Sequence, residues 1–370
     1  MASTIRQIAN ETGLSAATVS LALRGKGRIS DETRLKVQAA ARNLSYQPNP
    51  ALAKAFSLMR RPLARTYRES LAFIIEWPTP EGPEYQKKVH AAASERATAL
   101  GYKLESFILS GKPSDHRHLD RVLLARGIRG VIIIPRLGLV RPRLYLDWKH
   151  LAAVEIGRTL SFPRNLHHVE TGDYHKVIEA LHVLKRAGYR RIGMAVEPMH
   201  IQQHSGIYHA VYLLQQSKLP AQQRIPLLST YGSWGEKTFQ KWMLKYKPDV
   251  LYIHHAKTIF TWLKNMGLRV PQDISVFCVN VENAEYSGLR RDYAGMGRAA
   301  VDMVSLLLEN NTLGLVINPR CWQVDEFWQP GKTLSRPIDR FITTEGSLLP
   351  QVSDSRHSHP AESYAAAVLK

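Results

Sequence analysis

Short apolar runs alternate with longer amphipathic stretches over most of this chain of 370 residues. The apolar runs predict buried strands over residues 71–75, 104–109, 130–134, 151–156, 191–196, 250–253, 274–279 and 321–324. The amphipathic stretches predict helices over residues 85–100, 119–125, 174–186, 207–216, 258–266 and 299–308. Strands that alternate with helices are typical of doubly wound parallel sheets, because parallel strands need a crossover connection. We therefore expect an α/β fold from residue 70 onward.

The first 48 residues have a different, all-helical pattern. Gly13 supplies the backbone freedom for a tight turn between two short helices. Ser15 is placed to cap the second helix and Ser30 a third, since a serine hydroxyl accepts from the free amides of a first turn. The second helix has one apolar stripe, formed by Val19, Ala22 and Leu23. Three short helices joined in this way predict a helix-turn-helix module.

This segment is also strongly basic. Residues 1–68 hold twelve Lys and Arg against three Asp and Glu, in a chain whose net charge is +19. Such a surplus on a small helical module favours contact with the phosphates of DNA. A helical bundle that serves only packing is the alternative, but it gives no reason for the charge.

Many residues of this segment also form one ordered series. They are Thr4-Ile5, Ile8-Ala9, Gly13-Leu14-Ser15, Thr18-Val19-Ser20, Ser30-Asp31-Glu32-Thr33-Arg34 and Pro48-Asn49. This series resembles the DNA-binding headpiece of the lactose/galactose repressor (LacI/GalR) family of transcriptional regulators. The resemblance implies a regulator, in most cases a repressor, that binds a pseudo-palindromic operator in double-stranded DNA as a homodimer.

The resemblance also implies which side chains read bases. The family uses the first two residues after the capping serine and the sixth, which are Ala16, Ala17 and Leu21 here. The sixth residue is an arginine in many members. Leu21 has no donor for guanine, so we expect it to meet a thymine methyl group, unless it packs inside the headpiece. The whole set expected to contact DNA is Thr4, Ser15, Ala16, Ala17, Thr18, Ser20, Leu21, Arg24, Arg28, Ser30, Asn49, Leu52, Lys54, Ala55 and Phe56.

A short Ala-rich stretch follows Pro48-Asn49-Pro50. In the family the equivalent segment is a hinge helix that drives an apolar wedge into the minor groove. Gapless alignment places Ala55 at the wedge, a slip of one residue places Phe56 there, and Leu52 is a third candidate. A linker that packs on the next domain is the alternative, since a helix this short is marginal alone.

The C-terminal region resembles the effector domain of the same family, which is similar to periplasmic sugar-binding proteins with two lobes. Residues 187–193, 248–250, 267–276 and 297–301 carry that resemblance. The expected domains are a headpiece at 1–48, a hinge helix and linker at 49–69, and an effector-binding and dimerisation domain at 70–334. Its lobe 1 is expected at about 70–160 and 294–318, and its lobe 2 at about 166–289 and 321–334. Residues 335–370 lack periodicity and are expected to form a disordered tail.

The expected effector cleft departs from the family pattern. Gln203 stands where the family has an arginine, and Asn280 where it has an aspartate. His255 stands at the first position of the family's Asn-Asp pair. Neutral amides still donate and accept hydrogen bonds, so a neutral effector such as a sugar is expected. Three further residues are expected in the cleft: Trp77 and Trp234, which either stack on a sugar or merely pack, and Arg158, which follows a strand. A regulator whose cleft has lost its effector, or a binding protein without regulatory switching, are the alternatives.

The other function classes have weaker support. Cys278 and Cys321 lie in apolar runs and are expected to be two buried free thiols. The chain shows no signal-peptide pattern and no apolar run of membrane length, so a cytoplasmic protein without membrane contact is expected. Four histidine pairs, at 116/118, 167/168, 200/204 and 254/255, have no cysteine near them in sequence and are expected on the surface or in the cleft. We therefore expect no metal, no cofactor and no enzyme activity, since phosphate-loop and nucleophile-elbow motifs are also missing.

Overall fold

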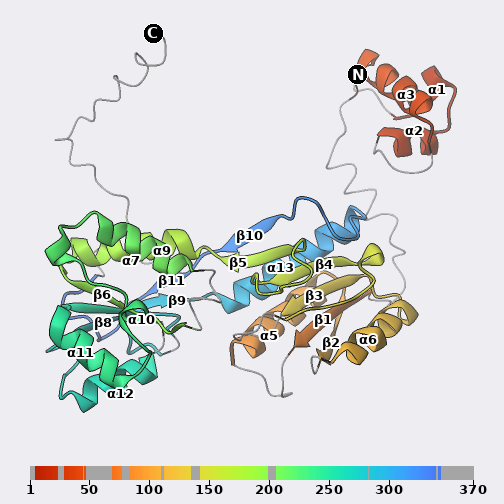
Figure 1. The fold of residues 1–370 in the computed structure, drawn as a ribbon. Coiled ribbons are helices and arrows are strands. Elements are labelled where there is room, and N and C mark those ends of the chain that lie inside the picture. The colour runs from red at the N-terminus through yellow and green to blue at the C-terminus, as the bar shows by residue number, and fades with distance from the viewer. Residues whose placement is uncertain are drawn as a thin grey trace, which may run out of the picture. The chain divides into compact units, whose positions relative to one another are not determined.

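The computed structural model describes residues 5–23, 29–44, 46, 69–76, 84–109, 112–134, 142–198, 206–254, 256–281, 283–338 and 341–342. The chain divides into two compact units, Met1–Tyr67 and Arg68–Lys370. The first unit is helical and the second is built on two sheets (Figure 1). Of the helices in the described ranges, none combines the length and the apolar character that crossing a bilayer requires.

The N-terminal unit is the expected three-helix module. It contains α1 (Ile5–Thr12), α2 (Ala16–Leu23) and α3 (Asp31–Asn43). Gly13 takes a φ of +71° in the turn between α1 and α2, a conformation that favours glycine. A single small core holds the helices together, with Ile8, Val19 and Val37 fully buried. The apolar stripe predicted for α2 is thus the face that packs.

The first sheet of the second unit is entirely parallel. Its order is β10-β5-β4-β3-β1-β2. The strands are β1 (Ser70–Glu76), β2 (Lys103–Leu109), β3 (Gly130–Ile134), β4 (Ala152–Ile156), β5 (His167–Thr171) and β10 (Cys321–Val324). Helices α5 (Glu84–Ala99) and α13 (Tyr293–Glu309) pack on one face, and α6 (Pro113–Ala125) on the other. The short 3-10 helix η1 (Trp148–His150) precedes β4.

The second sheet has the order β11-β9-β8-β7-β6, with β11 antiparallel to β9. Its strands are β6 (Ile192–Ala195), β7 (Val250–Ile253), β8 (Ser275–Val279), β9 (Gly288–Arg290) and β11 (Phe327–Gln329). Helices α7 (Asp173–Arg186) and α9 (Ile207–Ser217) cover one face, and α10 (Leu228–Tyr231), α11 (Glu236–Tyr246) and α12 (Ala256–Asn265) the other. The 3-10 helix η2 (Ala221–Gln223) follows α9. Helices on both faces explain why β6, β7 and β8 are buried throughout.

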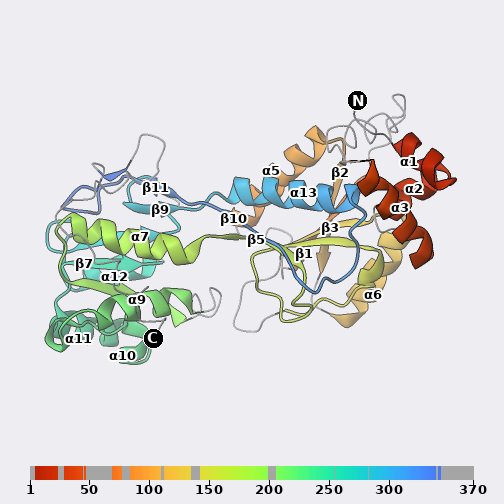
Figure 2. The ribbon, with the colours of Figure 1, turned by 90° about the horizontal axis from the view of Figure 1, so that it is seen from above.

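Helices α5 and α13 pack closely against each other (Figure 2). Gly297 of α13 permits this approach, because a Cβ atom at that position would overlap the carbonyl oxygen of Val89 on α5. An ion pair between Arg96 Nε and Asp302 Oδ1, at 2.7 Å, joins the same two helices. Together the two helices bury the face of the first sheet on which they pack, and the side chains of helices and sheet form one apolar cluster.

The chain passes from one sheet to the other at three crossovers: from β5 to α7, from β9 to α13, and from β10 to β11. The expected lobe limits need correction here. Strands β5 and β10 lie in the first sheet, although residues from about 166 and from 321 were assigned to lobe 2. Strand β5 extends the parallel sheet beside β4, and β10 extends it beside β5. The chain therefore passes from lobe 1 to lobe 2 only after residues 171 and 324.

The expected disordered tail also begins too early. Ile338 is 1% exposed and belongs to the core of the second sheet, and Phe341 packs against the same cluster. The amide of Arg336 donates to the hydroxyl of Tyr189 at 2.9 Å. Ile338, Phe341 and Ile342 therefore complete the apolar cluster that α7 and α9 form on this sheet. Residues 343–370 lie outside the described residues.

Candidate DNA interface and crossover site

Helix α2 presents a face of small and apolar side chains. Ala16 and Ala17 are exposed, and Leu21 is 40% exposed, while Val19 and Ala22 on the other side are buried. Leu21 therefore does not pack inside the headpiece. A face without long side chains allows the helix backbone to approach a flat partner closely, as a recognition helix does in a major groove.

Two serine side chains cap the N-terminal ends of α2 and α3. The hydroxyl of Ser15 accepts from the amide of Thr18 at 3.1 Å, and the hydroxyl of Ser30 accepts from the amide of Thr33 at 3.3 Å. Both caps were predicted. Thr18 and Ser20 are half-buried beside the exposed face, and Ser30 is exposed. The other residues assigned to DNA lie outside the described residues: Thr4, Arg24, Arg28, Asn49, Leu52, Lys54, Ala55 and Phe56.

Three of the residues expected in the effector cleft lie in the described residues, and each of them has different neighbours. Arg158 is exposed after β4. Trp234 is half-buried and its ring lies 5.3 Å from that of Trp262, within the cluster on α11 and α12. Asn280 follows β8 with a φ of +61°, and its Oδ1 accepts from the hydroxyl of Tyr293 at 2.7 Å. Trp77, Gln203 and His255 lie outside the described residues.

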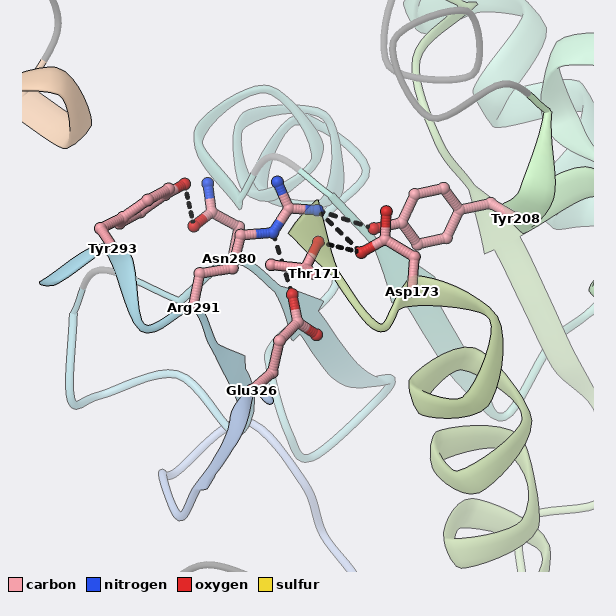
Figure 3. Close-up of polar contacts among 7 residues, drawn as sticks. All are labelled: Thr171, Asp173, Tyr208, Asn280, Arg291, Tyr293 and Glu326. Atoms are coloured by element: carbon pink, nitrogen blue, oxygen red, sulfur yellow. Dashed lines mark hydrogen bonds and ion pairs between the residues drawn. The ribbon is translucent and has the colours of Figure 1, made fainter. Parts of the chain in front are cut away.

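A buried polar network joins all three crossovers (Figure 3). Arg291, between β9 and α13, is its centre. Its Nε donates to Glu326 Oε1 at 2.9 Å, in the crossover from β10 to β11. Its Nη2 lies 3.5 Å from Asp173 Oδ1, at the start of α7. One guanidinium group therefore links segments that follow β5, β9 and β10.

Neighbouring polar groups complete the network. Nη2 of Arg291 donates to the hydroxyl of Tyr208 on α9 at 3.0 Å, and the hydroxyl of Thr171 donates to Asp173 at 2.6 Å. The side chains of Arg291, Asp173 and Glu326 are 10%, 12% and 1% exposed. Ion pairs this well shielded from water are screened far less than surface pairs.

Charge and burial oppose each other at this site. Burial alone would lower the pKa of Arg291, but Tyr208, Asp173 and Glu326 together hold that pKa well above its ordinary value. Burial raises the pKa of Glu326, with Arg291 opposing the rise and Asp173 adding to it. Burial also raises the pKa of Tyr208 well above its usual range. The arginine is therefore a fixed cation, whereas Glu326 is the group whose proton is held more firmly than usual.

Sequence reasoning missed this network. The sequence carries only two weak signals: the basic pair Arg290-Arg291, and the acidic pair Asp325-Glu326 between apolar residues late in the chain. Neither the pattern of apolar positions nor the family resemblance pairs residues that are 118 positions apart, as Arg291 and Asp173 are.

The expectation of two buried thiols is wrong for one of them. Cys278 is buried, but Cys321 is exposed, because β10 is the edge strand of the first sheet. Of the histidines expected on the surface or in the cleft, His116, His167, His168 and His254 are buried, so none of these four lies on the surface. The pairing of β5 with β10 also brings Cys321 beside His168, although the two are far apart in sequence.

Two family models match the chain. The model described as bacterial regulatory proteins, lacI family, matches residues 4–49, and the periplasmic binding protein-like domain matches residues 181–319. The HTH-type transcriptional regulator AglR of Rhizobium meliloti (strain 1021) is 26% identical over 198 residues, which are 53% of this chain and 53% of AglR. The match thus spans about half the length of that relative.

Two solved structures share the fold over most of the chain. A transcriptional regulator CelR–cellobiose complex has a TM-score of 0.51 and 16% identity, over 90% of this chain and 99% of that one. A lac repressor dimer bound to operator and the anti-inducer ONPF has a TM-score of 0.50 and 19% identity, over 90% and 100%. Identities this low establish the fold alone. The two family models show that the chain carries a helix-turn-helix domain of the lacI family of bacterial regulatory proteins at residues 4–49 and a periplasmic binding protein-like domain at residues 181–319.

Proposed function

We propose that the chain is a sequence-specific DNA-binding transcriptional regulator, acting as a repressor on a pseudo-palindromic operator. The observation that carries this proposal is the exposed face of α2, with Ala16, Ala17 and Leu21 outward on a capped helix-turn-helix. One such module covers a half-site, so we propose a homodimer that places two modules on one operator. As part of the same proposal, the protein works in the cytoplasm, where the DNA is, and has no enzyme activity.

We further propose that a small molecule bound between the two lobes sets the affinity for the operator. The crossover network supports this, because Arg291 ties together the three segments that any rotation of one lobe against the other must bend. A neutral polar ligand such as a sugar suits the site better than an anion. The charge of Arg291 is already balanced by Asp173 and Glu326, and CelR, a structural neighbour, is described with cellobiose.

A regulator whose cleft has lost its effector is the second candidate. The contact that favours it is the hydrogen bond from the hydroxyl of Tyr293 to Oδ1 of Asn280, which joins the start of α13 to the end of β8. This bond engages the side-chain oxygen of an amide that is expected to bind the effector.

Selection from random duplex DNA with the full chain tests the main proposal. We expect one enriched motif with two-fold symmetry, bound at physiological salt at least about 10³-fold more tightly than scrambled DNA. Ala17→Glu should abolish this binding, because a carboxylate on the exposed face repels phosphates. Ala39→Glu is the matched control, since Ala39 is also exposed but lies on α3. Equal affinity for all sequences would instead indicate a nucleoid-type protein.

Thermal-shift measurements on the full chain separate the two candidates for the effector. A panel of monosaccharides, disaccharides and sugar phosphates should contain a neutral sugar that raises the melting temperature by mass action and changes operator affinity. A chain that binds its operator but responds to no member of the panel supports the second candidate.

A further inference from the structure

Three metal-ligating side chains meet at the edge of the first sheet. His168 and Glu170 are two residues apart on β5, so they point to the same face of the sheet. Cys321 is the register partner of His168 on β10, which lies beside β5 in both views (Figures 1 and 2). The ligating atoms of all three lie within 4.8 Å of one another. Sγ of Cys321 is 3.3 Å from Glu170 Oε1, and His168 Nε2 is 4.0 Å from Glu170 Oε2.

The imidazole of His168 is oriented as a metal ligand would be. Its Nδ1 lies 3.4 Å from the carbonyl oxygen of Leu166, a contact in which Nδ1–H donates. This tautomer leaves the lone pair of Nε2 on the side of Glu170. Metal-bound histidines usually make such a bond from their other nitrogen, because it fixes the ring and its tautomer. The side chain is 7% exposed, so few other rotamers are open to it.

The charges around the cluster decide which ion fits. In the absence of a cation, the thiol of Cys321 donates to Oε1 of Glu170 at 3.3 Å. Arg158 opposes a cation, since its positive charge acts on Cys321. Glu170 itself supplies the opposing negative charge. Glu155 on β4 is the register partner of His168 on β5, and its Oε1 accepts from the amides of Thr159 and Leu160.

We propose that His168, Glu170 and Cys321 form a binding site for a divalent transition-metal ion, with zinc as the ion that the donor set fits best. Nitrogen, carboxylate oxygen and thiolate are the usual ligands of Zn²⁺, and three protein ligands leave a fourth position for water. Bonds of about 2.0–2.3 Å require the three side chains to close in slightly, which rotation of the exposed Cys321 permits. Binding converts the thiol to a thiolate and releases its proton to solvent.

The site has a consequence for the crossovers. Strand β5 leads within two residues to Asp173, and β10 leads within two residues to Glu326. A metal ion that joins β5 to β10 would therefore fix the starting points of two of the three segments that Arg291 holds. This step rests on the proposed regulatory function, whereas metal binding itself does not.

Titration of the full, chelator-treated chain with Co²⁺ tests the site. Tetrahedral Co²⁺ bound to a thiolate gives a sulfur-to-cobalt charge-transfer band in the near ultraviolet. We expect this band to saturate at one ion per chain and to disappear when Zn²⁺ displaces Co²⁺. Zn²⁺ should also raise the melting temperature, because an ion that binds the folded state stabilises it by mass action.

Variants assign the band to its residues. Cys321→Ser should remove the charge-transfer band, and Cys278→Ala should keep it; these are the two cysteines of the chain. Glu170→Gln should weaken Co²⁺ binding by at least about tenfold, judged from the losses seen at less direct positions. Glu179→Gln is the matched control, since Glu179 lies on α7 and pairs with Lys176. Absence of the band in the wild type, or a band retained in Cys321→Ser, would overturn the proposal. Failure of operator binding in the same samples would bear on the proposed function alone.

Discussion

Nε of Arg291 donates to Oε1 of Glu326 across 2.9 Å, and the carboxylate side chain is 1% exposed. This bond joins the second crossover of the chain to the third. Because both groups have left water, their pairing offsets a large desolvation penalty. Replacing Arg291 therefore measures how much a buried charge at the crossovers contributes to the free energy of unfolding.

Replacing Arg291 by Gln should destabilise the second unit severely. The change leaves Asp173 and Glu326 as neighbouring buried carboxylates, and loss of one partner of a buried pair costs about 3–5 kcal/mol. Urea unfolding followed by circular dichroism measures the difference in the free energy of unfolding. Arg291→Lys should recover only part of it, because an ammonium group lacks the forked geometry that reaches both acids.

An exposed ion pair provides the control for this experiment. Arg269 pairs with Asp273 at 2.8 Å, but its side chain is 74% exposed. Arg269→Gln should leave the free energy of unfolding close to that of the wild type, since solvent screens such pairs. Equal losses for Arg291→Gln and Arg269→Gln would mean that burial adds nothing at the crossovers.

The raised pKa of Glu326 predicts a dependence of stability on pH. A carboxyl group with a raised pKa binds its proton more firmly in the folded state, so its contribution is full below the unfolded value and is lost as pH rises through the folded value. The ordinary value is 4.5. As pH rises above this ordinary value, the wild type should therefore lose stability relative to Glu326→Gln, which does not titrate. Chemical unfolding of both proteins at several pH values measures the difference, and a flat difference would contradict the prediction.

Gly297 should tolerate no side chain larger than a hydrogen atom without cost. A Cβ atom there overlaps the carbonyl oxygen of Val89, so α5 and α13 would have to separate. Overpacking of this kind typically costs about 1–3 kcal/mol. We expect Gly297→Val to lower the thermal midpoint, whereas Gly235→Ala should not do so by a clash, since nothing lies within 4 Å of a Cβ atom at Gly235. A wild-type midpoint for Gly297→Val would show that the two helices separate easily.

The sequence predicts the elements well where one pattern of apolar residues covers a whole element. The stripe of Val19 and Ala22 on α2 and the apolar run of β3 are examples, and both are buried as expected. Strand β5 was not predicted, because His167, His168 and Glu170 interrupt its apolar character. Its place in the first sheet depends on pairing with β4 and with the distant β10, which no local pattern contains.

The candidate sites show the same limit. The residues of the helix-turn-helix lie close together in sequence, so a linear series of matches was enough to find the face of α2. The crossover network joins Arg291 to Asp173 and Glu326, and the proposed metal site joins Glu170 to Cys321, 151 positions apart. Such groups meet only after both sheets have formed, and the charge of a single residue does not predict its partner.

The exposure of Leu21 leads to a prediction about operator sequence. An apolar side chain in the major groove is best satisfied by the methyl group of thymine, and it offers no donor to guanine. Leu21 is 40% exposed and lies one turn of helix beyond Ala17, on the face that Val19 and Ala22 leave free. We therefore expect selected operators to carry thymine at one symmetric position. Leu21→Arg should shift that position to guanine, because arginine makes two hydrogen bonds to guanine that are worth about 1–3 kcal/mol of discrimination.

Leu35→Arg is the matched control for this change. Leu35 is also an exposed leucine of the headpiece, at 62%, but it lies on α3. Arginine there adds the same positive charge and should raise affinity for every sequence alike. Selection from randomised operators with the wild type and both variants decides the matter. If Leu21→Arg enriches the same motif as the wild type, Leu21 does not face the bases, and specificity must come from DNA shape or from other side chains.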